Sequence, residues 1–123
     1  IFFMGGNLMA ILVKKFGGSS VATPEKIHGI VNRVLKEKKP GDKIVIVVSA
    51  MGDSTDDLLA LAGRVNPEMP KRELDMLLAT GEQVTIALMA GAFWQKASLR
   101  FLLRVRRPEL KPATNILKQA LLM

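Results

Sequence analysis

Lysine, glycine and hydroxyl side chains stand together near the start of the sequence, in the segment 14–20, Lys-Lys-Phe-Gly-Gly-Ser-Ser. Glycines let a backbone come close to a phosphate, main-chain N–H groups can then donate to its oxygens, and a lysine adds positive charge. The spacing matches neither the Walker A loop nor the dinucleotide-binding glycine pattern. Because Gly-Gly-Ser-Ser after a strand is also common in plain turns, a phosphate site and a simple turn both remain open on this segment alone.

This segment lies between a predicted strand and a predicted helix. Residues 10–13, Ala-Ile-Leu-Val, are typical of a short buried strand. Thr23 is the predicted N-cap and Pro24 the first residue of a helix that reaches Lys39. His28 in this helix is predicted to be solvated or partly packed. One face of the helix is apolar and consists of Ile27, Ile30, Val31, Val34 and Leu35.

A second strand is predicted at residues 43–48, Lys-Ile-Val-Ile-Val-Val, and its β-branched run is typical of a strand buried on both faces. The two strands and the helix between them predict an α/β protein with a parallel βαβ core. Ligands of open α/β sheets bind beyond the carboxyl ends of the strands, so the loop 49–57 should lie beside Gly17 and Gly18. The hydroxyls and carboxylates of this loop could bind a metal–nucleotide complex or an amine, or cap a helix at 58–65, and the two roles are compatible.

A further helical segment is predicted over residues 71–93, with an interruption at 79–82, Ala-Thr-Gly-Glu. Glycine inside a helix costs about 1 kcal/mol relative to alanine, which favours a break or a close backbone approach at Gly81. Glu82 is predicted to cap the helix that follows the break, the alternative being that it reaches into the site.

Composition limits the classes of protein that fit. The 123 residues allow one domain, and the absence of cysteine excludes disulfides and thiolate metal sites and favours a reducing compartment, so we expect a cytoplasmic protein. A single histidine argues against a histidine metal site or a catalytic triad, and no protein metal centre is predicted. On sequence alone, no apolar run approaches the length needed to cross a bilayer, so we expect no membrane partner.

The net charge of +7 is concentrated in residues 94–123, which hold seven lysines and arginines against one acid. The other 93 residues carry a net charge of +1. A small basic nucleic-acid-binding module built on Arg100–Lys111 is therefore one alternative, and salt-dependent DNA binding would reveal it. The segment lacks interleaved aromatic residues, so we expect no nucleic-acid partner.

Three motifs, taken together and in this order, closely resemble the start of bacterial aspartokinase, which has the amino-acid-kinase fold. They are Val-Lys-Lys-Phe-Gly-Gly-Ser-Ser-Val at 13–21, Val-Val-Ser-Ala-Met-Gly-Asp-Ser-Thr-Asp at 47–56, and Arg-Glu-Leu-Asp-Met-Leu-Leu-Ala-Thr-Gly-Glu-Gln at 72–83. The resemblance covers residues 9–93 and implies an incomplete amino-acid-kinase fold. It also implies that ATP and L-aspartate give ADP and 4-phospho-L-aspartate, the first committed step towards lysine, threonine and methionine. Another amino-acid-kinase relative, such as glutamate 5-kinase, is the alternative, against which the motif at 72–83 argues.

The resemblance also implies roles for individual residues. Lys15 would be catalytic, because its charge would steady the transferred phosphoryl group, and Glu82 would pair with the ammonium of aspartate. Mg²⁺ would accompany ATP, and family members form homo- or hetero-oligomers. The ATP-binding residues implied are Lys15, Phe16, Gly17, Gly18 and Ser49, and the substrate-binding residues are Asp53, Ser54, Thr55, Asp56 and Glu82.

Both ends of the sequence depart from this family. Residues 1–8 are expected to be a non-native leader, since Met9 could start the protein. Residues 94–123 lack the Thr-Gly-Ala-Gln-Ala-Gly-Ile segment of the family, and we expect that they were read from a shifted frame, which the codons of the gene would test. On this hypothesis Arg100–Pro112 should pack poorly. Because the second half of the nucleotide pocket and the arginine for the substrate carboxylate are absent, the chain alone should be inactive.

Overall fold

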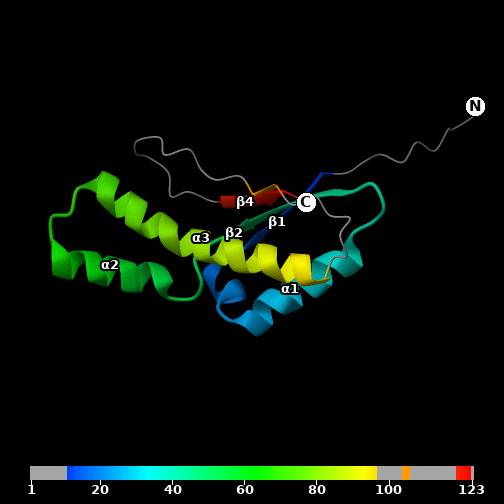
Figure 1. The fold of residues 1–123 in the computed structure, drawn as a ribbon, viewed down its shortest axis with the longest axis horizontal. Coiled ribbons are helices and arrows are strands. Elements are labelled where there is room, and N and C mark those ends of the chain that lie inside the picture. The colour runs from blue at the N-terminus through cyan, green and yellow to red at the C-terminus, as the bar shows by residue number, and fades with distance from the viewer. Residues whose placement is uncertain (1–10, 97–103, 106–118, 123) are drawn as a thin grey trace, which may run out of the picture.

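The structure is a computed structural model that describes residues 11–96 and the backbone of two short strands, 104–105 and 119–122 (Figure 1). The expected leader, and most of the segment 100–112, lie outside the described residues. The elements in chain order are β1 (Ile11–Phe16), a 3₁₀ turn η1 (Gly18–Val21), α1 (Pro24–Glu37), β2 (Lys43–Val48), α2 (Ser54–Val65), α3 (Lys71–Lys96), β3 (Arg104–Val105) and β4 (Gln119–Leu122).

The sheet has the strand order β1-β2-β4-β3. β1 and β2 are parallel, with Ile11 opposite Lys43 and Phe16 opposite Val48, so the predicted βαβ core is confirmed. β4 pairs antiparallel with β2 and with β3, which makes the sheet mixed. No strand was predicted in this part of the chain. The pairing is physically reasonable because the free edge of β2 presents unpaired N–H and C=O groups that can accept another strand.

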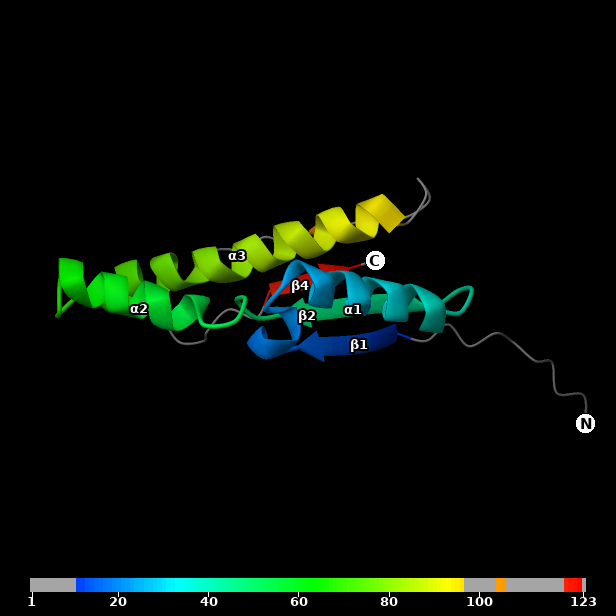
Figure 2. The ribbon, with the colours of Figure 1, turned by 90° about the horizontal axis from the view of Figure 1, so that it is seen from below.

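Helices α1 and α3 cover one face of β1 and β2 (Figures 1 and 2). On β2 the side chains Ile44, Ile46 and Val48 point to the helices and are at most 2% exposed, whereas Val45 and Val47 on the other face are only partly buried. The prediction that this strand is buried on both faces was therefore wrong for the described residues, in which helices pack on one face only. The core residues contributed by the helices are Ile27, Ile30, Val31, Val34, Ile86, Met89, Ala92 and Phe93.

Helix α1 begins as the sequence predicts. The Oγ1 atom of Thr23 accepts a hydrogen bond of 3.4 Å from the backbone N–H of Lys26, and Pro24 occupies the first turn. The helix ends at Glu37, two residues earlier than predicted, shortly before a turn in which Gly41 adopts a φ of +89°. An ion pair between Lys14 and Glu37 joins the end of the helix to β1.

Helices α2 and α3 both differ from the sequence prediction. α2 begins at Ser54, inside the polar loop, and its predicted start at residue 58 was wrong. Its N-cap residue, Asp53, makes no side-chain capping bond, while Asp56 and Asp57 in the first turn complement the helix dipole. α3 is one continuous helix, so the predicted interruption at 79–82 was wrong, whereas the alternative expectation, a close backbone approach at Gly81, is confirmed.

Helix α3 is long and apolar enough to cross a membrane by length and composition, since an 18-residue window has a mean hydropathy of 1.4. The sequence-based statement that no such run exists was wrong. In the fold, 44% of that window is buried, and Thr85, Met89 and Phe93 are almost inaccessible against the rest of the domain. Part of the apolar surface of α3 thus belongs to the core, while Met76, Val84, Leu88 and Trp94 are exposed.

Candidate functional site

The glycine pair after β1 forms a tight turn. The backbone N–H of Ser20 donates to the carbonyl oxygen of Gly17 at 2.9 Å, which closes η1. A Cβ atom on Gly17 would meet nothing within 4 Å, whereas one on Gly18 would lie 2.8 Å from the carbonyl oxygen of Ala50. Packing therefore requires glycine at position 18, whereas position 17 has room for a side chain.

The loop after β2 lies directly against this turn, as the sequence predicts. The backbone N–H of Gly52 donates to the carbonyl oxygen of Gly18 at 3.1 Å, and the N–H of Ser49 donates to that of Phe16 at 3.2 Å. Gly52 has a φ of +49°, a left-handed conformation that glycine adopts without strain. The carboxyl ends of the two parallel strands are thereby joined into one backbone unit.

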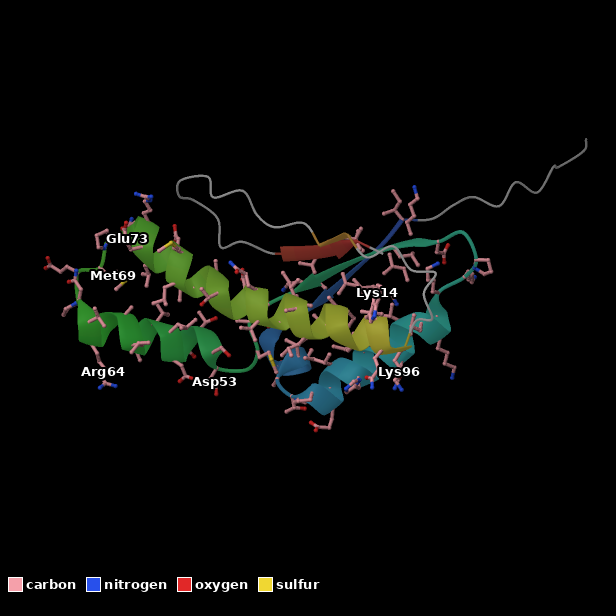
Figure 3. All side chains as sticks on the ribbon, viewed as in Figure 1. Lys14, Asp53, Arg64, Met69, Glu73 and Lys96 are labelled. Carbon is pink, nitrogen blue, oxygen red and sulfur yellow. The ribbon has the colours of Figure 1, made fainter. Side chains whose placement is uncertain are left out.

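The two lysines at the end of β1 point to opposite faces of the sheet. Lys14, labelled in Figure 3, shares the helix-covered face with Phe16. It forms the ion pair with Glu37, and its hydrogen bond to this carboxylate lowers the pKa of Glu37. Lys15 alternates with it and is exposed on the face of Ile11 and Val13, which are 68% and 67% exposed. Among residues 11–96, Lys15 has no ion-pair partner. Lys15 is therefore the lysine at the strand end that is available to a ligand.

The polar loop places the predicted substrate-side residues at the start of α2, where Figure 3 labels Asp53. Asp53, Thr55 and Asp56 are exposed to solvent. Ser54 is partly buried, and its hydroxyl donates to the carbonyl oxygen of Met51, so it already has an internal partner. Together with Asp57, which is also exposed, the loop thus offers three carboxylates and the hydroxyl of Thr55 to solvent beside the glycine turn.

Glu82 lies in the interior of α3 and is only 8% exposed. The prediction that it caps a helix was wrong, because α3 is continuous through this position. Its carboxylate has no hydrogen-bond or ion-pair partner among the described residues, and its oxygens keep some contact with solvent. Partial burial raises its pKa. A partly desolvated carboxylate without a partner favours a cationic ligand, because such a ligand would offset the cost of desolvating the charge.

We expect Glu82→Gln to make the chain more stable at neutral pH. The raised pKa means that the folded state binds the proton of Glu82 more tightly than the unfolded state does. The contribution of Glu82 to the free energy of unfolding is therefore fully present below pH 4.5, the pKa of this group in the unfolded chain. It is lost as the pH rises through the pKa of the folded state. Urea unfolding of both proteins at pH 4 and pH 7 should give a stability gap that opens in favour of Glu82→Gln at the higher pH. A gap that stays constant with pH would contradict the assigned cause.

A shallow hollow lies on the other side of the turn, lined by Ser19, Ser20, Lys26, Gly29, Ile30 and Arg33. The ammonium of Lys26 already donates to the carbonyl oxygen of Ser19 at 2.9 Å, and the guanidinium of Arg33 lies over the ring of Phe16 at 5.7 Å. None of the residues predicted to bind ATP or substrate lines this hollow. The candidate site is instead the edge where β1, β2 and α3 meet.

The described residues contain no group of three or more histidine, aspartate and glutamate side chains that could hold a metal ion. Mg²⁺ in phosphoryl-transfer sites is usually held by one or two carboxylates together with substrate phosphates, and a dedicated cage is not needed. The exposed carboxylates of Asp53 and Asp56 are compatible with that mode of binding.

A family model described as the amino acid kinase family matches residues 10–119. The chain belongs to this family. It is 54% identical over 88 residues to an aspartokinase of Bacillus sp. (strain MGA3), and 53% identical over 88 residues to aspartokinase 2 of Bacillus subtilis. These matches cover 72% of this chain, and 21% and 22% of the two relatives.

Solved structures give the same relationship. An aspartate kinase from Synechocystis superposes with a TM-score of 0.67 and 48% sequence identity, over 70% of this chain and 15% of that one. The chain is therefore a member of a kinase family, with the mixed α/β architecture of part of an aspartate kinase, and it spans about a fifth of the length of the curated relatives it matches.

Sequence analysis did not single out Ala50, although its carbonyl and methyl groups lie where all three motifs meet. A Cβ atom on Gly18 would approach the carbonyl oxygen of Ala50, and one on Gly81 would approach its methyl group. The only feature of the sequence that pointed to Ala50 was that a small residue directly follows the β-branched strand. It becomes informative only when the neighbouring segments are placed in space.

Proposed function

We propose that this chain is the N-terminal part of an aspartate kinase. The full enzyme transfers the γ-phosphoryl group of ATP to the side-chain carboxylate of L-aspartate, which gives ADP and 4-phospho-L-aspartate for amino-acid biosynthesis in the cytoplasm. The observation that carries this proposal is the meeting of the three motifs around Ala50, which brings the glycine turn, the polar loop and the helix of Glu82 to one edge of the sheet.

The residues on the nucleotide side can supply positive charge and hydrogen-bond donors. We assign the ATP phosphates to Lys15, the turn 16–18 and Ser49, with Lys15 stabilising the charge of the transferred group. Phosphoryl transfer needs positioning and charge neutralisation more than covalent catalysis by the protein. A lysine and main-chain N–H donors supply both kinds of interaction. When bound, Mg²⁺ would add to this neutralisation through the phosphate oxygens.

The residues on the substrate side can recognise an amino acid. We assign the ammonium of aspartate to Glu82, whose buried carboxylate would regain a partner on binding. The loop residues 53–56 would orient the rest of the substrate, with Thr55 as a hydroxyl donor. A charge-assisted hydrogen bond between the ammonium and this carboxylate would be stronger than one between neutral groups.

A chimera tests this function. In it, the 88 residues that match replace the corresponding segment of aspartokinase 2 of Bacillus subtilis. We expect aspartate-dependent release of ADP from the chimera and none from the purified 123-residue chain, which spans only a fifth of such an enzyme. Activity of the isolated chain would contradict the second expectation. A folded chimera that releases no ADP and forms no 4-phospho-L-aspartate in the presence of ATP and aspartate would contradict the proposed function.

A further inference from the structure

Helix α3 comes closest to the rest of the site at Gly81. A Cβ atom there would lie 3.1 Å from the Cβ atom of Ala50, 3.4 Å from Cδ1 of Leu58 and 4.0 Å from the Cβ atom of Ser54. Both Gly81 and Ala50 are buried, and the hydroxyl of Thr85, which is fully buried, donates to the carbonyl oxygen of Gly81 at 3.3 Å. Helix α3 therefore contacts the loop directly through the backbone of Gly81.

Ala50 makes a second close approach, in which its carbonyl oxygen lies against Gly18. Its carbonyl oxygen would lie 2.8 Å from a Cβ atom on Gly18, so the glycine turn rests on the carbonyl group and α3 rests on the methyl group of the same residue. Ala50 is 4% exposed and follows directly after β2. One small residue thus separates the glycine turn that follows β1 from the helix that carries Glu82.

We infer that the contact between Gly81 and Ala50 is a spacer that sets the position of Glu82 relative to the glycine turn. This inference rests on the proposed function, because it gives Glu82 its role toward the substrate ammonium. Gly81 and Ala50 are positioning residues that touch neither substrate. The contact also explains why a glycine, which weakens a helix, stands in the middle of α3.

Gly81→Ala in the chimera is the direct test. The added methyl group would meet the methyl group of Ala50 at 3.1 Å, and neither group can rotate away, so α3 must move by a few tenths of an ångström. A misplacement of about 1 Å can cost about 10²-fold in an enzyme, so we expect the aspartate KM to rise by about tenfold. The KM for ATP should stay within about twofold, because the glycine turn keeps its contacts to the loop.

Two further variants make the test specific. Gly91→Ala adds the same methyl group to the same helix at a position where nothing lies within 4 Å, and it should leave both KM values unchanged. The double variant Ala50→Gly/Gly81→Ala moves the methyl group from the loop to the helix, keeps the spacing, and should restore the aspartate KM to within about threefold of the parent. Circular dichroism checks that each chimera is folded.

The outcomes separate the inference from the proposed function. An unchanged aspartate KM in Gly81→Ala would overturn the spacer, as would a double variant that remains impaired. If Gly81→Ala fails to fold, the double variant alone decides, since it restores the spacing. An unsubstituted chimera that folds but lacks aspartate-dependent activity would instead remove the proposed function.

Discussion

Lys15→Ala in the chimera is expected to lower kcat by about 10²–10³-fold, the usual effect of removing one preorganised group that stabilises transition-state charge. Lys15 is exposed at the carboxyl end of β1 and has no ion-pair partner among the described residues. Its charge is therefore available to a phosphoryl group beside the glycine turn. Steady-state kinetics with both substrates varied would separate this loss from a change in KM.

The neighbouring lysine is the matched control. Lys14 has the same charge and lies in the same strand, but it points to the opposite face and pairs with Glu37. Exposed pairs of this kind contribute little, so Lys14→Ala should leave kcat within about twofold of the parent. Equal losses in the two variants would show that the strand tolerates neither change. Unaltered turnover in Lys15→Ala would remove its assigned role.

The sequence predicts the βαβ core well because two independent patterns agree on it. The β-branched run of β2 and the apolar face of α1 both match the structure, and Thr23 and Pro24 mark the start of α1 correctly. The predicted first strand ended at Val13, while β1 continues to Phe16. For that reason the sequence alone does not show that Lys14 and Lys15 project to opposite faces.

Local rules fail where tertiary contacts decide the structure. A glycine within a helix favours either a break or a close backbone approach at Gly81, and the sequence alone does not decide between them. In the structure α3 is continuous, and Gly81 makes the close approach to Ala50. The same continuity places Glu82 in the buried interior of a helix, where it cannot be a cap. The roles assigned to individual site residues come from the family resemblance and stay predictions until the variants are measured.

The pairing of β4 with β2 is a second case in which sequence pattern was insufficient. Residues 119–122, Gln-Ala-Leu-Leu, carry no alternation that would distinguish a strand from a short apolar segment. Their register is set by the edge of β2, where Val48 stands opposite Gln119 and Val45 opposite Leu122. Such long-range pairing depends on which edge is free, and the sequence of either strand alone does not contain that information.

Gly18→Ala is expected to lower the free energy of unfolding of the chain by about 1–3 kcal/mol, the usual cost of forcing an extra carbon into a filled space. The new Cβ atom would lie 2.8 Å from the carbonyl oxygen of Ala50 and 3.2 Å from that of Gly52. Both are backbone atoms, so the two turns must separate. The hydrogen bond between the N–H of Gly52 and the carbonyl oxygen of Gly18, at 3.1 Å, would be strained or lost.

Gly17→Ala, one residue earlier, should have the opposite profile. Gly17 has a φ of −77° and a ψ of 171°, which alanine adopts without strain, and its Cβ atom would meet nothing within 4 Å. Stability should therefore stay the same or rise by about 0.4–1 kcal/mol, because alanine restricts the unfolded chain. In the chimera, the same methyl group would occupy the open space through which a phosphate approaches the turn, so the ATP KM should rise while the aspartate KM does not.

Urea unfolding of the two variants, together with kinetics of the corresponding chimeras, distinguishes packing from binding within one dipeptide. If the pair only formed a tight turn, Gly17→Ala would leave the ATP KM unchanged, whatever its effect on stability. If both glycines were needed for packing, Gly17→Ala would destabilise the chain as Gly18→Ala does. A rise of the ATP KM in Gly17→Ala without loss of stability requires that the open side of the turn receives the nucleotide, because no described protein atom lies there for the methyl group to disturb.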